Sequence, residues 1–222
     1  MPQPLDMKNT FFLLLLFVGL APVVISLTKS KPVRLFNGKN FKGWQGDTLR
    51  TWRIQDGALV GGSLTEKVPH NEFLSTTKSY SNYVLRLKFK LTGTEGFING
   101  GVQFHSQRIA KPPYEMTGYQ ADLGKGYWAS LYDESRRDKL LATADSNQIK
   151  QILRPNDWND YEVRTQGKQI QIFLNGKPTV DYTETDPAIP QSGLIALQTH
   201  GGGKVEVYYK DIFLQELPQK TK

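Results

Sequence analysis

The segment at residues 84–91 alternates apolar and basic residues with a period of two. The apolar residues that share one side of it are Leu85, Leu87, Phe89 and Leu91. A strand sends successive side chains to opposite faces, whereas a helix would scatter these residues around its axis. The pattern therefore predicts a β-strand with one face on a core and a basic face toward solvent.

Short runs of the same kind follow one another after residue 30, with turn signals between them. They cover 52–54 and 58–60 around Asp56-Gly57, 159–164 and 169–174, and 193–199 and 204–214 around three glycines. Asn175-Gly176 favours a tight hairpin turn, and the last two runs are expected to form a strand pair. Short strands at this spacing predict an all-β, two-sheet antiparallel β-sandwich. We expect one domain over 32–217 and a frayed tail at 218–222.

Composition excludes several classes of protein. The chain has 222 residues, no cysteine, and 28 Lys and Arg against 21 Asp and Glu, for a net charge of +7. The lack of cysteine excludes disulfide scaffolds, cysteine-ligated zinc and thiol nucleophiles. The positive charge is not gathered in a basic helix or stripe, so no nucleic acid partner is predicted.

The N-terminus carries an apolar run from Phe11 to Leu27, interrupted by Pro22. It is shorter than the roughly 20 residues of a membrane span. We interpret residues 1–27 as a signal peptide, so the protein is expected to be secreted or periplasmic. The alternative is an uncleaved anchor, which is the only membrane association that the sequence suggests.

Three later strands place polar residues opposite their apolar ones. Val102 and Phe104, Ala121 and Leu123, and Ile195 and Leu197 alternate with polar neighbours, and we expect them to face the core. The polar residues that strand parity then puts on the outer side are Gln103, His105, Gln120, Asp122, Gln198 and His200. If these strands are neighbours, the six side chains converge in one cleft.

Amides, imidazoles and a carboxylate on one face are typical of sugar recognition rather than of a plain solvent face. The segment 118–137 adds aromatic rings at Tyr127, Trp128 and Tyr132 and charges at Asp133, Glu134, Arg136 and Arg137. Loops that hold several aromatic rings often carry function. The alternative is a polar solvent face beside a loop of paired charges.

Several motifs recur in a fixed order along the chain. They are LFNGKNFKGW at 35–44, Trp52 with DGAL at 56–59, NGGV at 99–102, WNDYE at 158–162, LNG at 174–176 and GLIALQTHGG at 193–202. With these motifs the chain resembles the 3-keto-disaccharide hydrolase family over nearly all of its length after residue 30. The resemblance implies a concanavalin-like jelly roll and a hydrolase that acts on 3-keto-glycosides.

The chain departs from the family pattern at three positions of the expected site. Gln120 stands where the family usually has Glu, Asp122 where Gln is common, and His105 where Arg is usual. These departures indicate a variant branch of the family.

A 3-keto group acidifies the proton at C2, so cleavage is expected by proton abstraction, elimination and addition of water. Asp122 and His105 are the candidate base and acid, and Arg136 is the candidate stabiliser of the enolate. Further substrate contacts are expected from Asn99, Gln103, Gln120, Trp128, Tyr132, Asp133, Glu134, Gln198 and His200. The sequence identifies no cofactor, and a divalent metal held by His200, His105 and Asp122 is an alternative to Arg136.

The expected partner is a carbohydrate, either a 3-keto-glycoside or another glycan. Two non-enzymatic alternatives stay open. One is a lectin-like carbohydrate-binding sandwich, which keeps the aromatic rings and amides but needs no acid or base. The other is an adhesion sandwich with no small ligand.

Overall fold

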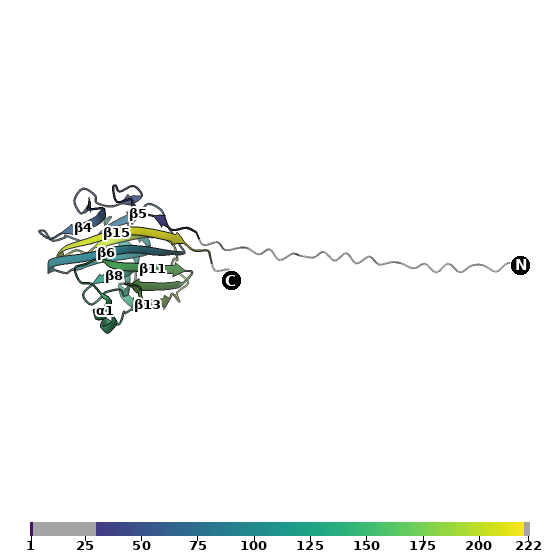
Figure 1. Ribbon diagram of the computed structural model, residues 1–222. Helices are drawn as coiled ribbons and strands as arrows, with labels where there is room; N and C mark the ends of the chain where they lie inside the picture. Colours follow the sequence, from purple (N-terminus) through teal and green to yellow (C-terminus); the bar gives the residue numbers. More distant parts are fainter. Residues whose placement is uncertain (2–29, 220–222) are drawn as a thin grey trace.

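The computed structural model describes Met1 and residues 30–219. The signal peptide expected at residues 1–27 lies, apart from Met1, outside the described residues. The described part is an all-β sandwich in which two antiparallel sheets lie face to face (Figure 1). The fold class predicted from strand alternation is confirmed.

The eight-stranded sheet contains the longest strands of the chain. Its order is β13 (Lys177–Thr183), β12 (Gln169–Leu174), β11 (Asn159–Gln166), β6 (Tyr83–Gly96), β15 (Gly203–Glu216), β4 (Ala58–Ser63) and β3 (Trp52–Gln55), and β1 (Val33–Arg34) also pairs with β15. The hairpins predicted at Asp56-Gly57 and Asn175-Gly176 both form. Asn175 and Gly176 have φ angles of 48° and 77°, as a tight β-hairpin turn requires.

The seven-stranded sheet carries the predicted site. Its order is β10 (Lys139–Ala142), β9 (Leu131–Glu134), β8 (Met116–Gly124), β7 (Asn99–Arg108), β14 (Leu194–Thr199), β5 (Glu72–Thr76) and β2 (Trp44–Gln45). One short helix, α1 (Ser146–Ile152), lies at the lower end of the sandwich in Figure 1.

The expectation that the last two strands form a pair is wrong. β14 lies between β7 and β5 in one sheet, and β15 lies between β6 and β4 in the other. Three consecutive glycines at 201–203 carry the chain across the sandwich instead of closing a hairpin. Residues 194–199 are thereby released to pair with β7, beside the predicted site.

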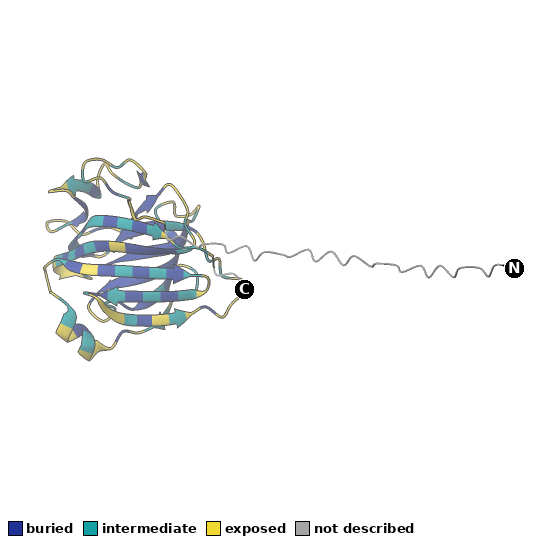
Figure 2. Ribbon diagram, turned by 45° about the vertical axis from the view of Figure 1, so that its right-hand side comes forward, coloured by how far each residue is buried: buried dark blue, intermediate teal, exposed yellow. Residues whose placement is uncertain are grey.

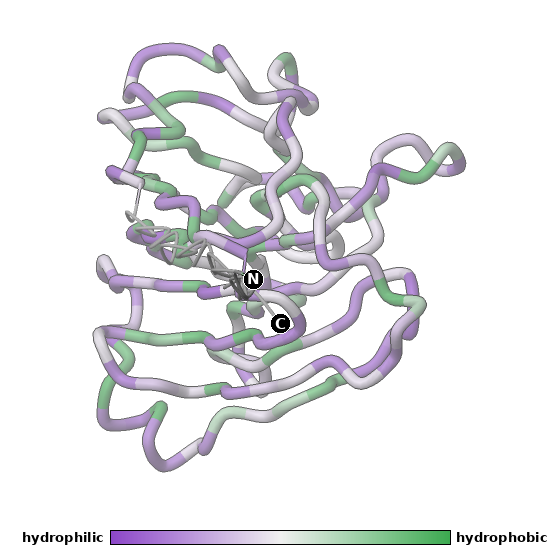
Figure 3. Tube along the Cα trace, turned by 90° about the vertical axis from the view of Figure 1, so that its right-hand side faces the viewer, coloured by the Kyte–Doolittle hydropathy of each residue, from purple (hydrophilic) through white to green (hydrophobic). Residues whose placement is uncertain are grey.

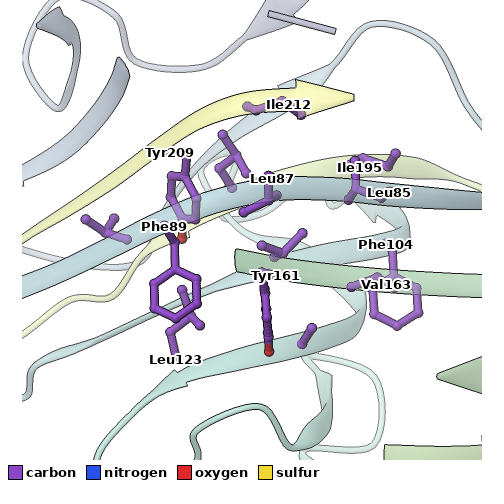
Figure 4. Close-up of a cluster of buried hydrophobic side chains, with 14 of the residues drawn as sticks. Leu85, Leu87, Phe89, Phe104, Leu123, Tyr161, Val163, Ile195, Tyr209 and Ile212 are labelled. Carbon is purple, nitrogen blue, oxygen red and sulfur yellow. The ribbon is translucent and has the colours of Figure 1, made fainter. Parts of the chain in front are cut away.

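The core lies between the two sheets. The seven residues predicted to be buried there are all buried, and they are Leu85, Leu87, Phe89, Val102, Phe104, Ile195 and Leu197. Figure 4 shows five of them, with Tyr161 and Tyr209 reaching in among them. Burial alternates along the strands in Figure 2, and hydropathy alternates in Figure 3, as a period of two requires.

Among the described residues, no helix is long and apolar enough to cross a membrane.

Candidate functional site

The register of β14, β7 and β8 brings the predicted polar residues together. Gln198 pairs with Gly101, which pairs with Asp122 on its other side, and Gln103 pairs with Gln120. The Gln120 side-chain amide donates to Gln198 Oε1 at 3.0 Å. Strand parity is therefore confirmed for the four residues Gln103, Gln120, Asp122 and Gln198, which share the outer face of the seven-stranded sheet.

His105 does not share that face, so its predicted place in the cleft is wrong. Its φ angle is 48°, and the pairing of β7 with both neighbours shifts register around it. Such a β-bulge inserts one residue and reverses the parity of the strand at that point. The His105 ring points between the sheets, with Nε2 at 2.8 Å from the Ser81 carbonyl and its edge against Tyr83. Burial lowers the pKa of His105 to about 4, so the ring is neutral at pH 7.

A pocket of about 120 Å³ opens on the outer face, over the end of the sheet where β7 begins. We call it the polar pocket. Its lining residues are Phe97, Asn99, Gln120, Asp122, Tyr127, Tyr132, Glu134 and His200. Five of the predicted contacts, namely Asn99, Gln120, Tyr132, Glu134 and His200, thus meet Asp122 in one place. Tyr127, one of the rings named in the segment 118–137, packs edge to face with Phe97 beside them, and Phe97 was not predicted.

Three donors converge on one oxygen of Asp122. Oδ1 accepts from Asn99 Nδ2 at 3.2 Å, from the Leu123 backbone amide at 3.1 Å and from Gln120 Nε2 at 3.5 Å. Among the described residues no hydrogen bond reaches Oδ2. This arrangement fixes the carboxyl group through Oδ1 and leaves Oδ2 available to a substrate.

Asp122 and Glu134 form a pair of carboxyl groups around one amide. Gln120 Nε2 lies 3.5 Å from Asp122 Oδ1 and 3.4 Å from Glu134 Oε2. Burial raises the pKa of Asp122 to about 8, the Asn99 hydrogen bond opposes the rise, and the charge of Glu134 adds to it. Burial raises the pKa of Glu134 to about 7, with a further rise from Glu115 and Asp138. Two acids that exchange protons near neutral pH are suited to general acid–base catalysis.

The outer face of the seven-stranded sheet needs a glycine at position 101, below the Gln120 side chain. A Cβ there would lie 2.5 Å from Gln120 Cδ, because the Gln120 side chain crosses over this glycine. Beside it, Gln103 is fully buried, and neither atom of its side-chain amide has a hydrogen-bond partner among the described residues. The amides behind the polar pocket thus keep unused hydrogen-bonding capacity.

Arg136 and Asp133 belong to a different cluster, so the predictions that placed them at the cleft are wrong. Asp133 is buried on the inner side of β9, where Arg136 Nε donates to it at 2.8 Å and Arg137 also bonds to it. The Arg136 guanidinium lies 4.6 Å from the centre of the Tyr119 ring, inside the sandwich. Parity explains the separation, because Tyr132 and Glu134 face the polar pocket while Asp133 faces inward.

Of the two rings predicted as substrate contacts, Tyr132 lines the polar pocket, and Trp128 points away from it. The Trp128 ring stacks against Phe89 with centroids 6.2 Å apart. It lines a second cavity beside α1. The turn that follows β8 therefore sends Tyr127 to one cavity and Trp128 to the other.

The metal-ligand set suggested by the sequence does not form, because His105 lies on the opposite side of the sheet from Asp122. Among the described residues, no three histidine or acidic side chains are arranged to hold a metal ion.

Two buried tyrosines of the opposite sheet hold the site strands from behind. The Tyr161 hydroxyl donates to the Asp122 carbonyl at 3.2 Å. The Tyr209 hydroxyl lies 2.9 Å from the Gly101 carbonyl and 3.0 Å from the Gln198 carbonyl. Sequence analysis missed both, since the alternation around them predicts burial but not which strand lies opposite.

Comparison with known protein families matches residues 31–215 to the 3-keto-alpha-glucoside-1,2-lyase-like domain. The chain belongs to this family. The match confirms the resemblance inferred from the ordered motifs. No curated protein matches the chain.

Solved structures share the fold of this family member. One of them is a protein from Parabacteroides distasonis ATCC 8503 that has been provisionally named a glycosyl hydrolase. It is 23% identical to this chain, the match covers 84% of this chain and 94% of that chain, and the TM-score is 0.62. The carbohydrate binding module CBM66 from Bacillus subtilis is 15% identical over 78% of this chain and 96% of its own, with a TM-score of 0.61. A Bacillus subtilis protein with a galectin-like fold is 11% identical over 86% of this chain and 97% of its own, with a TM-score of 0.62. These likenesses show that the sandwich is a jelly roll.

Proposed function

We propose that this family member cleaves the glycosidic bond of 3-keto-glycosides, using Asp122 and Glu134 as its acid–base pair. The observation that carries the proposal is that these two carboxyl groups lie around Gln120 Nε2 in one pocket of about 120 Å³. The family name, which refers to a 3-keto-alpha-glucoside lyase, supports the substrate class.

The surroundings of the two carboxyl groups suggest their roles. Burial raises the pKa of both, and the charge of Glu134 raises that of Asp122 further, so we assign Asp122 as the protonated acid and Glu134 as the ionised base. Glu134 then takes the C2 proton, and the electron pair moves onto the C3 oxygen as an enolate. The enolate re-forms the carbonyl as the C1–O bond breaks, and Asp122 gives its proton to the departing oxygen.

Addition of water completes hydrolysis by the reverse exchange. Water gives a proton to Asp122 as its oxygen bonds to C1, and Glu134 returns a proton to C2. Both carboxyl groups regain their starting states, so atoms and charges balance. The elimination half of this sequence is a lyase step, and the added water makes the overall reaction a hydrolysis.

Neutral donors stabilise the enolate in this proposal. No Lys or Arg lines the polar pocket among the described residues, whereas Asn99, Tyr127 and Tyr132 do line it. Amide and hydroxyl donors aimed at a developing oxyanion stabilise it without the desolvation cost of a buried cation. They take the role that the sequence suggested for Arg136.

The test is turnover of a 3-keto-disaccharide by the purified protein, followed as free sugar and as the unsaturated ketone. Asp122→Asn keeps the shape of the side chain but cannot donate the acid proton. We expect it to lower kcat at least about 100-fold, the usual scale of acid–base assistance, with substrate affinity changed much less. The matched control is Asp181→Asn, since Asp181 is exposed on β13 and bonds only to glutamine amides there.

Full turnover by Asp122→Asn would contradict the proposed acid. Binding of the disaccharide without cleavage by the wild-type protein would favour the carbohydrate-binding alternative. Two observations favour that alternative. Gln120 stands where the family usually has Glu, and the chain shares its fold with the carbohydrate binding module CBM66.

A further inference from the structure

A second cavity lies beside the helix α1, behind the turn that closes the polar pocket. Its volume is about 430 Å³, compared with about 120 Å³ for the polar pocket. The lining residues are Lys125, Gly126, Trp128, Ser130, Thr143, Ala144, Ser146, Ile149, Lys150, Leu153 and Pro155. The proposed cleavage reaction uses none of them.

The inner lining of this cavity is mostly apolar. Ile149 belongs to the core cluster, and Trp128 and Leu153 pack against it. A cavity of this size with apolar walls and a few polar groups has the character of a small-molecule site. Its walls favour a ligand with an apolar ring over a sugar, because most hydroxyls of a sugar would find no partner there.

The charged side chains that line this cavity are all positive. Lys125 and Lys150 are its only charged lining residues, and both are exposed. Among the described residues neither lysine has an ion-pair partner. Asp145, the acid closest along the chain to α1, accepts from the Asn147 backbone amide at the start of the helix. Two unpaired ammonium groups above an apolar floor complement an anion attached to an apolar body.

We propose that this cavity binds a small carboxylate whose apolar ring packs against Trp128, with the carboxylate between Lys125 and Lys150. The proposal does not depend on the cleavage of 3-keto-glycosides. The wall of the cavity is joined to the acid of the polar pocket, because Asp122 and the segment Ala129–Ser130 exchange backbone hydrogen bonds of 2.9 and 3.0 Å. A ligand there would therefore contact the turn that also carries Tyr127.

The experiment is calorimetric titration of the full chain with naphthalene-2-carboxylate and with its neutral amide. We expect the carboxylate to bind the wild-type protein about tenfold more tightly than the amide, the scale of a charge-assisted contact. The double variant Lys125→Gln, Lys150→Gln should lose this preference. The matched control Lys168→Gln, Lys177→Gln removes two exposed lysines elsewhere, one in the turn before β12 and one at the start of β13, and should keep it.

A second variant tests the apolar floor, and a sugar acid tests the class of ligand. Trp128→Leu should weaken the carboxylate and the amide to the same degree. Equal binding of carboxylate and amide by the wild-type protein would overturn the proposal, as would no detectable binding of either. Glucuronate that binds as tightly as naphthalene-2-carboxylate would overturn the assignment of an apolar ring.

Discussion

Asp122 and Glu134 are acids that folding places where the ionised form is costly. Asp122 is only 4% exposed, and its charged form must share the site with Glu134. The other buried aspartate of this sheet, Asp133, is instead paired with two arginines, Arg136 and Arg137. This difference in pairing separates the polar pocket from the ion-pair cluster around Asp133.

Stability should depend on pH because of Asp122. Its pKa rises from 3.8 to about 8 on folding, so between these values the native state holds a proton that the unfolded state has released. Unfolding then releases a proton, and the stability of the wild-type protein falls as pH rises to about 8. Asp122→Asn removes this loss, so its Tm relative to wild type should increase from pH 5 to pH 9.

Thermal melts of both proteins at pH 5, 7 and 9 check this expectation. Asp181→Asn serves as the control, because hydrogen bonds from Gln171 and Gln169 lower the pKa of Asp181 and leave it ionised throughout this range. A Tm difference for Asp122→Asn that stays constant across these pH values would contradict the raised pKa.

The strands β7, β8 and β14 carry the site, and strands of the other sheet hold them in place. Tyr209 on β15 reaches the carbonyls of Gly101 and Gln198, and Tyr161 on β11 reaches that of Asp122. Figure 4 shows both rings inside the core. The eight-stranded sheet therefore positions the site without contributing a side chain to the polar pocket.

Replacing Tyr209 with Phe removes a buried hydroxyl while keeping the ring. The expected cost is about 1 kcal/mol of unfolding free energy, the usual net value of one hydrogen bond. The matched change Tyr83→Phe should be neutral or slightly stabilising, because the buried Tyr83 hydroxyl has no hydrogen-bond partner among the described residues. Urea unfolding of the two variants measures the difference, and equal costs would contradict the anchoring role of Tyr209.

The whole sandwich divides its two sheets between different tasks. The outer face of the eight-stranded sheet carries several ion pairs between neighbouring strands, such as Lys88 with Asp160 and Arg53 with Glu206. The outer face of the seven-stranded sheet instead carries buried amides and the two acids. The polar pocket therefore opens on one outer face of the sandwich, and the other outer face carries the ion pairs.

We propose that the protein is exported, on the evidence of the apolar run at residues 11–27. Mass spectrometry of exported material should find a new N-terminus between about Leu27 and Pro32, with the run removed by signal peptidase. Recovery of the full-length chain in the membrane fraction would instead identify this segment as an anchor.

Sequence alone determined the features that depend on local alternation. It predicted the sandwich, the seven buried core residues and the common face of Gln103, Gln120, Asp122 and Gln198, because strand parity is set by neighbouring residues. It also predicted the family, since the motifs keep their order along the chain.

Tertiary structure decided the features that depend on pairing between distant strands. The bulge at His105 reverses its parity, and no local pattern marks it, because the histidine at positive φ is held there by distant residues. These are Tyr83 at the start of β6 in the other sheet and Ser81 just before that strand. The choice of Glu134 rather than Arg136 as the partner of Asp122 likewise follows from how β9 pairs with β8. Parity is a property of one strand, whereas register and sheet order result from packing the whole chain.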